Sequence, residues 1–216
     1  ATKIHNLSDL GTNDYADRRE FSKQLLKSGL PKGVKAVLHQ GACSDTMATN
    51  GREVMEMNFS FSRILLESCL YRETPLIYAS SAAIYGAGKK SSVDSKNESP
   101  LNVYAYSKFL FDRFVSDQLG SFSSQVVGLR YFNVYGPRES HKGKMASVIH
   151  QMFHQLKSQG CIKLFEGTGS FGDGEQRRDF VYVRDVVAVN LYMLEHSEVK
   201  GIINVGTGRS RSFNDA

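Results

Sequence analysis

The chain has 216 residues, 41% hydrophobic and 23% charged, with a formal net charge of +5. This composition excludes a disordered chain and indicates a globular protein with a substantial core. No apolar stretch is long enough to span a membrane. Basic residues form no long run, so we expect a small anionic partner and neither nucleic acid nor a membrane.

Neither a secretory signal nor a metal site is recognisable, and the cytoplasm is the default location. The three cysteines, Cys43, Cys69 and Cys161, are odd in number and widely spaced. This spacing argues against a disulfide framework and against zinc, so we predict three small, buried apolar residues and no metal.

Apolar runs alternate with helical patterns along the chain, as in a parallel sheet with crossover helices. Strands are predicted at 34–39, 76–81, 125–130 and 202–206. Helices are predicted at 52–71 and from Tyr104 onward, and Ser212 is a candidate cap of a further helix.

Residues 1–33 lack the glycine-rich turn with which a dinucleotide-binding fold opens. Their only glycines are Gly11, Gly29 and Gly33, and Ala1 is not an initiator methionine. We therefore expect an internal segment that begins after the second strand of such a fold and lacks its first strand and glycine-rich turn.

Three side chains, Ser81, Tyr104 and Lys108, together indicate a redox site. Tyr104 and Lys108 are four residues apart in a helical pattern, so both project from one helix face. A nearby ammonium favours the phenolate and brings a tyrosine into catalytic range. Ser81 ends the apolar strand 76–81, and its hydroxyl is predicted to bind the same reacting oxygen as Tyr104.

These motifs resemble those of the extended short-chain dehydrogenase/reductase family, which acts largely on nucleotide sugars. The resemblance rests on Ser81, on Tyr-x-x-x-Lys from Tyr104, and on Arg-Tyr-Phe-Asn-Val-Tyr-Gly-Pro from Arg130. It implies an α/β, Rossmann-type doubly wound parallel sheet with a small substrate-binding lobe. The implied division is an incomplete NADP-binding domain at 1–132, the lobe at 133–179, a return to the sheet at 180–207 and the start of the lobe tail at 208–216.

Three further segments resemble the ADP-glyceromanno-heptose 6-epimerase branch of this family. They are the run from Gly136 to Ser147 with its His-Lys-Gly element, Leu-Phe-Glu-Gly-Thr at 164–168 and the run from Arg177 to Asp185. The last two look like a hairpin leading into a helix. The resemblance implies an NADP-dependent homo-oligomer that inverts the carbinol at position six of ADP-heptose, for lipopolysaccharide inner-core synthesis. Inversion requires a second acid/base besides Tyr104, and the resemblance assigns Lys142.

The resemblance also assigns binding residues. The implied cofactor contacts are Lys3, Arg18, Gln40, Gly41, Ala42, Cys43, Ser44, Asn58, Lys108, Val134 and Lys142. The implied substrate contacts are Ser81, Asn133, Lys144, Gln151, Phe165, Glu166, Gly167, Thr168 and Arg178. Lys144 and Gln151 depart from the serine and histidine that are frequent at these positions, which leaves the sugar contacts open.

Two alternatives remain at this level. One is another nucleotide-sugar enzyme, such as a UDP-sugar 4-epimerase. A dehydratase is disfavoured because Ala82 and Ala83 offer no acid/base pair after the serine. The other is a dinucleotide-binding protein without activity, although both Tyr104 and Lys108 are present.

Overall fold

The computed structural model describes residues 5–88 and 90–216, in two compact units. The larger unit comprises residues 13–131 and 188–204, and the smaller unit comprises 132–187, 205–216 and the described residues up to 12. The predicted domain boundaries differ from this division in four places, because residues 5–12, 180–187, 205–207 and Phe132 belong to the smaller unit. The second difference arises because the strand at 180–182 pairs with a strand of that unit.

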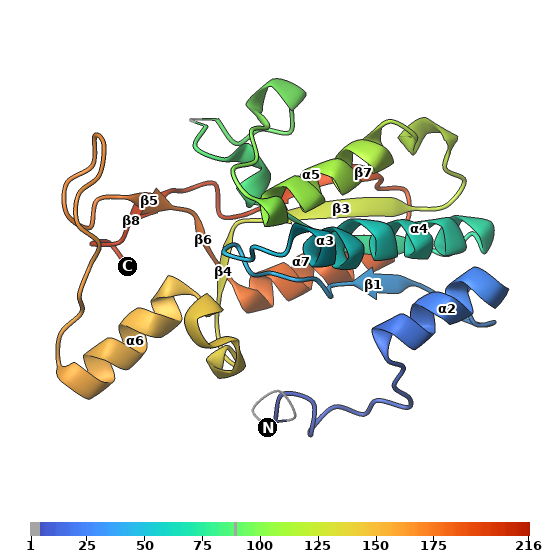
Figure 1. Cartoon of the computed structure of the whole chain (residues 1–216), viewed down its shortest axis with the longest axis horizontal. Coiled ribbons are helices and arrows are strands. Elements are labelled where there is room, and N and C mark those ends of the chain that lie inside the picture. The colour runs from blue at the N-terminus through green and yellow to red at the C-terminus, as the bar shows by residue number, and fades with distance from the viewer. Residues whose placement is uncertain (1–4, 89) are drawn as a thin grey trace. The chain divides into compact units, whose positions relative to one another are not determined.

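A four-stranded sheet forms the centre of the larger unit (Figure 1). Its order is β1 (Val37–His39), β2 (Leu76–Ser81), β3 (Val126–Tyr131) and β7 (Gly201–Val205). The pairs β1–β2 and β2–β3 are parallel, with Ser80 opposite Arg130. Both β2 and β3 are almost wholly buried, as expected for parallel strands covered on two faces.

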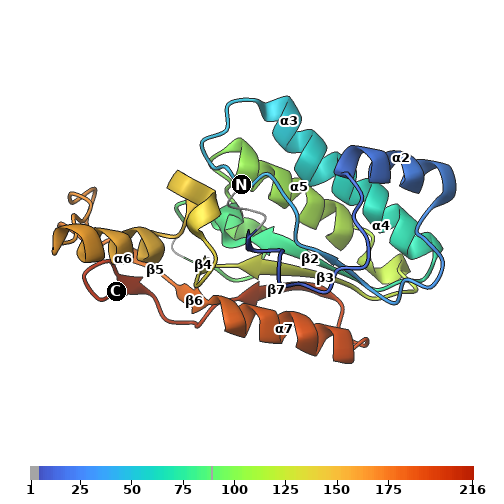
Figure 2. The same cartoon turned by 90° about the horizontal axis from the view of Figure 1, so that it is seen from below.

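Helices cover both faces of this sheet (Figure 2). On one face lie α2 (Arg18–Ser28), α3 (Gly51–Met55), α4 (Phe61–Tyr71) and α5 (Val103–Ser116), and residues 188–195 of α7 (Val183–Glu195) cover the other. Leu66 and Cys69 of α4 and Phe111 of α5 pack with Tyr78 and Val126 in the core. This arrangement confirms the predicted α/β fold class.

The helix predicted at 52–71 contains an irregularity that its sequence pattern does not reveal. A π-helical turn, η1 (Glu56–Ser60), joins α3 to α4 and buries Asn58. Such turns occur mostly as single bulges in α-helices and are frequent at functional sites.

Two short strand pairs and one helix build the smaller unit. β4 (Asn133–Tyr135) pairs in parallel with β6 (Phe180–Tyr182), and β5 (Arg177–Arg178) pairs antiparallel with β8 (Arg211–Ser212). α6 (Val148–Gln159) is capped by Ser147, whose Oγ accepts a hydrogen bond from the amide of His150.

Four 3₁₀ turns complete the described elements of the two units. η2 (Ala82–Tyr85), η3 (Ser95–Asn97) and η4 (Leu119–Ser121) belong to the larger unit, and η5 (Ser140–Met145) belongs to the smaller one.

Two predictions for the smaller unit hold only in part. Residues 165–174 do turn back on themselves, with the Gly174 amide donating to the Phe165 carbonyl at 2.9 Å, but Arg177 and Arg178 pair with β8, which comes from a distant part of the sequence. Ser212 lies in β8, and no helix begins there among the described residues. Its hydroxyl nevertheless accepts a hydrogen bond from the Asp215 amide, and the Asp215 carboxylate accepts one from the Ser212 amide, which is the reciprocal pattern of a capping box.

The cysteine prediction holds only in part. Cys69 is buried, Cys43 is half-buried and Cys161 is exposed, and all three are free thiols.

No helix in the described part of the chain is both long and apolar enough to cross a membrane. Within the same residues, no group of three or more His, Cys, Asp or Glu side chains is placed to hold a metal ion.

Candidate functional site

Ser81 and Tyr104 meet at the carboxyl end of β2. The side chain of Asn102 caps α5 by accepting a hydrogen bond from the Ala105 amide, so the helix begins just before Tyr104. The Ser81 hydroxyl hydrogen-bonds the Tyr104 phenol and also accepts a hydrogen bond from the Ala83 amide at 3.1 Å. The structure thus brings together two side chains that the sequence separates by 23 positions.

Lys108 follows Tyr104 by four residues on α5 and is buried. Its Nζ donates a hydrogen bond to the carbonyl oxygen of Ala79 at 2.6 Å. Burial lowers the pKa of Lys108 to about 8, against the opposing effect of the Asp112 charge. The ammonium therefore remains the main form at neutral pH, in a position fixed by the backbone of β2.

The structure gives the pKa of Tyr104 a cause of shift that the sequence does not reveal. The sequence predicts a phenolate favoured by Lys108, but burial raises the pKa of Tyr104, and the Ser81 hydrogen bond only partly offsets burial. Because Lys108 is directed to the Ala79 carbonyl, its charge does not dominate the environment of the phenol. Burial therefore favours the neutral phenol of Tyr104.

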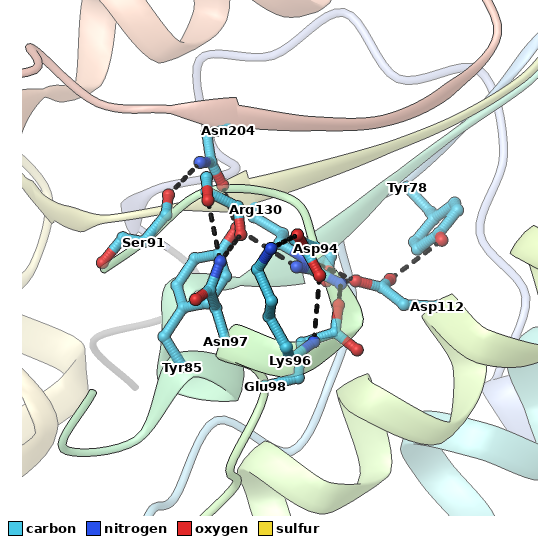
Figure 3. A network of polar contacts seen from close by, with 12 residues as sticks. Tyr78, Tyr85, Ser91, Asp94, Lys96, Asn97, Glu98, Asp112, Arg130 and Asn204 are labelled. Carbon is cyan, nitrogen blue, oxygen red and sulfur yellow. Dashed lines mark hydrogen bonds and ion pairs between the residues drawn. The ribbon is translucent and has the colours of Figure 1, made fainter. Parts of the chain in front are cut away.

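A buried ionic network fixes α5 against the sheet (Figure 3). The Asp112 carboxylate on α5 accepts hydrogen bonds from Tyr78 at 2.9 Å, from Ser80 at 2.8 Å and from Nε of Arg130 at 2.8 Å. Arg130 also donates to Glu98 at 2.6 Å and to Tyr85 at 3.1 Å. These contacts join β2, β3 and the turn before α5, and so set the position of the helix that carries Tyr104.

Asn58 shapes the Gly41–Ser44 loop that follows β1. Its Oδ1 accepts a hydrogen bond from the Cys43 amide at 2.8 Å, and its Nδ2 donates to the Cys43 carbonyl at 2.9 Å. The same Nδ2 donates to Ser107, whose hydroxyl donates to the carbonyl of Tyr104. Asn58 therefore links the loop predicted to hold the cofactor to the helix that bears Tyr104, while its own cofactor contact stays a prediction.

Sequence reasoning missed His39, which lies beside this loop. Its Nε2 is 2.8 Å from the hydroxyl of Ser62, and that hydroxyl donates its single proton to the Asn58 carbonyl. Nε2 must therefore carry the hydrogen that it shares with Ser62.

Gln40, a predicted cofactor contact, forms hydrogen bonds within the protein. Its side chain bonds Asn190 at 3.1 Å and Tyr131 at 2.9 Å.

Arg18 lies on α2 at a basic pocket of about 350 Å³. The pocket is lined by Arg18, Arg19, Ser22, Lys23, Glu56, Ser60, Phe61 and Ile64. The guanidinium of Arg18 lies over the Phe61 ring and 3.9 Å from the Glu56 carboxylate. Lys3, the other residue predicted near the adenosine phosphate, lies outside the described residues.

A larger pocket, of about 760 Å³, lies in the smaller unit. The predicted binding residues at its wall are Asn133, Val134, Phe165, Glu166, Thr168 and Arg178. The other lining residues, which sequence reasoning missed, are Ser147, Val148, Leu164, Gln176, Phe180 and Phe213. The Arg178 guanidinium lies over the Phe213 ring at 5.7 Å, so this pocket presents a cation, aromatic rings and amides together.

Two details define the polar character of this pocket. Gln176 donates from Nε2 to the Glu166 carbonyl at 2.6 Å, while its Oε1 is buried and has no hydrogen-bond donor among the described residues. Gly167 is close to the wall but does not line it, and an added Cβ there would lie 2.7 Å from the Phe171 carbonyl oxygen. The turn thus requires glycine, whatever Gly167 contacts in a complex.

Lys142 lies in η5, outside the lining of the large pocket. Its Nζ is 3.4 Å from the carboxylate of the buried Glu139, and its side chain is 42% exposed. Gly143 follows with φ of 55°, a conformation that favours glycine. Lys144 is exposed, and Gln151 donates hydrogen bonds to the carbonyls of Lys144 and Ala146, so Gln151 supports the backbone of this segment.

The sequence profile of the NAD dependent epimerase/dehydratase family matches residues 9–206. The chain therefore belongs to this family.

Among its relatives, the chain is similar to the ADP-L-glycero-D-manno-heptose-6-epimerase of Thiobacillus denitrificans, with 52% identity over 215 residues. That match covers 100% of this chain and 65% of the relative, so the chain spans less than two thirds of its length.

Solved structures give a consistent result. The Helicobacter pylori ADP-L-glycero-D-manno-heptose-6-epimerase has a TM-score of 0.78 and 40% identity, covering 92% of this chain and 61% of that one. The UDP-N-acetylglucosamine 4-epimerase of Methanobrevibacter ruminantium has the same TM-score of 0.78 at 26% identity, covering 96% of this chain and 67% of that one.

Proposed function

We propose that the protein is an NADP-dependent epimerase that inverts the carbinol at position six of ADP-glycero-manno-heptose, in lipopolysaccharide inner-core synthesis. The observation that carries this proposal is the high identity to a heptose epimerase along the whole chain. UDP-sugar 4-epimerases share the fold at clearly lower identity, so that alternative is not favoured. An inactive protein is not favoured either, because Ser81, Tyr104 and Lys108 are all present in bonded positions.

The residues present fit a nicotinamide dinucleotide. The Gly41–Ser44 loop is held in shape by Asn58 and would present backbone amides to the cofactor. The basic pocket at Arg18 suits the additional phosphate that distinguishes NADP from NAD. When bound, the nicotinamide would accept hydride from the carbinol carbon and return it to the opposite face.

The protein supplies the proton transfers. Ser81 and Tyr104 would hydrogen-bond the reacting oxygen, and the neutral phenol of Tyr104 is suited to protonate an alkoxide. Inversion requires a second acid/base for the other face, and we assign Lys142 to it. In one direction of the reaction, Lys142 takes the hydroxyl proton as the carbinol is oxidised, and the Tyr104 phenol gives its proton to the oxygen as the ketone is reduced. In the other direction, Tyr104 enters as the phenolate and takes the hydroxyl proton, and the Lys142 ammonium gives its proton.

The large pocket of the smaller unit would bind the nucleotide part of the substrate. Arg178 is the pyrophosphate candidate, because a guanidinium can donate two hydrogen bonds to neighbouring oxygens. Phe165 is 59% exposed at the wall and offers a ring for the base. Oε1 of Gln176, which has no partner within residues 5–88 and 90–216, would accept a hydrogen bond from the ligand.

The experiment that tests this function is a substrate comparison with the intact protein. We expect ADP-heptose to be epimerised at position six, read by NMR, while UDP-glucose and UDP-N-acetylglucosamine are unchanged. We also expect Arg18→Ala to weaken NADP binding more than NAD binding. Turnover of a UDP-sugar with no effect on ADP-heptose would replace the proposal with the 4-epimerase alternative.

On the basis of the family resemblance we further infer a homo-oligomer, and we infer a cytoplasmic location as the default. Sedimentation of the intact protein and fractionation of the source cell test these two inferences. A monomer in sedimentation, or recovery outside the cytoplasmic fraction, would contradict the corresponding inference.

A further inference from the structure

Glu139 is a buried acidic residue that the proposed reaction does not use. It lies between β4 and η5 and is only 4% exposed. A buried carboxylate is costly unless its oxygens accept several hydrogen bonds. The partners of Glu139 therefore indicate what this residue does.

Both carboxylate oxygens of Glu139 are engaged. Oε1 accepts hydrogen bonds from the Gly136 amide at 3.0 Å and from the Ser147 hydroxyl at 2.7 Å. Oε2 accepts from the Ser147 amide at 2.8 Å and faces Nζ of Lys142 at 3.4 Å. The Glu139 side chain thus links the end of β4 to the start of α6. Its remaining contact, at Oε2, is with the Lys142 ammonium.

These contacts span both ends of the segment that carries Lys142. Gly136 precedes the segment, and Ser147 follows it as the residue that caps α6. The backbone is held in unusual conformations here, with φ of 69° at Arg138 and 55° at Gly143. Non-glycine residues keep such a conformation only where their surroundings enforce it.

The contacts of Glu139 also explain why its carboxyl group is ionised. Burial alone would raise the pKa of Glu139, but hydrogen bonds from Ser147 and Gly136 and the Lys142 charge outweigh burial and lower this pKa. Glu139 is therefore a fixed anion at neutral pH. Because backbone amides fix the Glu139 carboxylate in place, the carboxylate determines the position of the Lys142 ammonium.

From this geometry we propose that Glu139 is the positioning residue for Lys142: it sets the path of the segment from Gly136 to Ser147 and holds the ammonium within reach of its carboxylate. The assignment rests on the proposed function, in which Lys142 is the second acid/base. Glu139 itself touches neither substrate nor cofactor in this role. It acts through Lys142, which keeps enough exposure to reach a ligand.

The first test needs no variant and no substrate. Amine labelling of the intact protein with an N-hydroxysuccinimide ester, followed residue by residue by mass spectrometry, compares Lys142 with Lys144. Lys144 is exposed in the same segment, and none of the ion pairs among the described residues involves it. We expect Lys142 to react more slowly than Lys144, and equal or faster labelling of Lys142 would overturn the proposal.

The second test uses Glu139→Gln, with Glu195→Gln on the exposed surface of α7 as the matched control. We expect Glu139→Gln to raise the labelling of Lys142 relative to Lys144 and to lower kcat for ADP-heptose about a hundredfold, the scale of a misplaced reactive group, with KM unchanged. The control should change neither. Unchanged labelling or unchanged kcat in Glu139→Gln would refute the role.

A double-mutant cycle separates positioning from general support. If Glu139 acts through Lys142, then adding Glu139→Gln to Lys142→Met costs no further activity, because the two residues work as a unit. If the loss of activity in the double variant is instead the product of the two single losses, Glu139 acts on something other than Lys142. If the intact protein does not epimerise ADP-heptose at all, the proposed function fails, while the labelling result still decides the contact between Glu139 and Lys142.

Discussion

Acidification should destabilise the larger unit through one buried histidine, His39. The ring is 8% exposed and lies edge-on to Phe61, with Nε2 bonded to Ser62. Burial, and after it the charge of Lys108, lowers the pKa of His39 from 6.5 to about 4. The folded protein therefore resists protonation of this ring, whereas the unfolded chain does not.

The sign and size follow from proton linkage. Between the two pKa values the unfolded state binds more protons than the folded state, so stability falls as the pH falls from about 6.5 through about 4. A shift of 2.5 units, which is 6.5 minus 4, corresponds to a loss of about 3 kcal/mol over this window. Above pH 6.5 both states carry a neutral ring, and this contribution is constant.

Urea unfolding of the intact protein at pH 7 and pH 4 measures the effect. Carboxylates also titrate in this range, so the informative quantity is the difference between the wild type and His39→Gln, whose amide can still donate to Ser62. His196→Gln is the matched control, because that ring is 38% exposed. Equal acid-induced losses of stability in the wild type and His39→Gln would refute the reasoning.

Three further predictions concern catalysis and packing. Tyr104→Phe should lower epimerisation by about a hundredfold or more, the usual scale for a positioned acid/base, and near-normal turnover would remove Tyr104 from the mechanism. Arg130→Met strands the buried Asp112 and Glu98 carboxylates and should cost about 3–5 kcal/mol in urea unfolding, part of it recovered by adding Asp112→Asn. Gly128→Ala would place a Cβ 2.4 Å from the Tyr78 hydroxyl and should cost about 1–3 kcal/mol, whereas Gly120→Ala, with open space around it, should be neutral.

Local sequence patterns predicted the elements that depend on local chemistry. The strand that ends at Ser81 and the helix that carries Tyr104 and Lys108 follow from an apolar run and from helical spacing, and the structure confirms both. A buried strand and a helical pattern are readable because each depends on its immediate neighbours.

Features that depend on distant partners were not predictable in this way. Phe213 joins Phe165 at the pocket although 48 positions separate them, and nothing near either residue in the sequence signals the contact. The π-helical turn buries Asn58, whose side chain bonds Cys43 and Ser107 at distant positions of the sequence. Lys108 was expected to act on Tyr104, but the carbonyl of Ala79 on the neighbouring strand determines where its ammonium lies.

The central claim is that the carbinol is inverted by removal and return of the same hydride. A carbinol carbon with no adjacent carbonyl is too weak an acid for Tyr104 or Lys142 to deprotonate directly, so a carbanion route faces a much higher barrier. The most direct measurement is to run the intact protein with ADP-heptose and NADP in heavy water and to read the product by NMR. We predict inverted product with no deuterium at position six, and stoichiometric deuterium at that carbon would contradict the account.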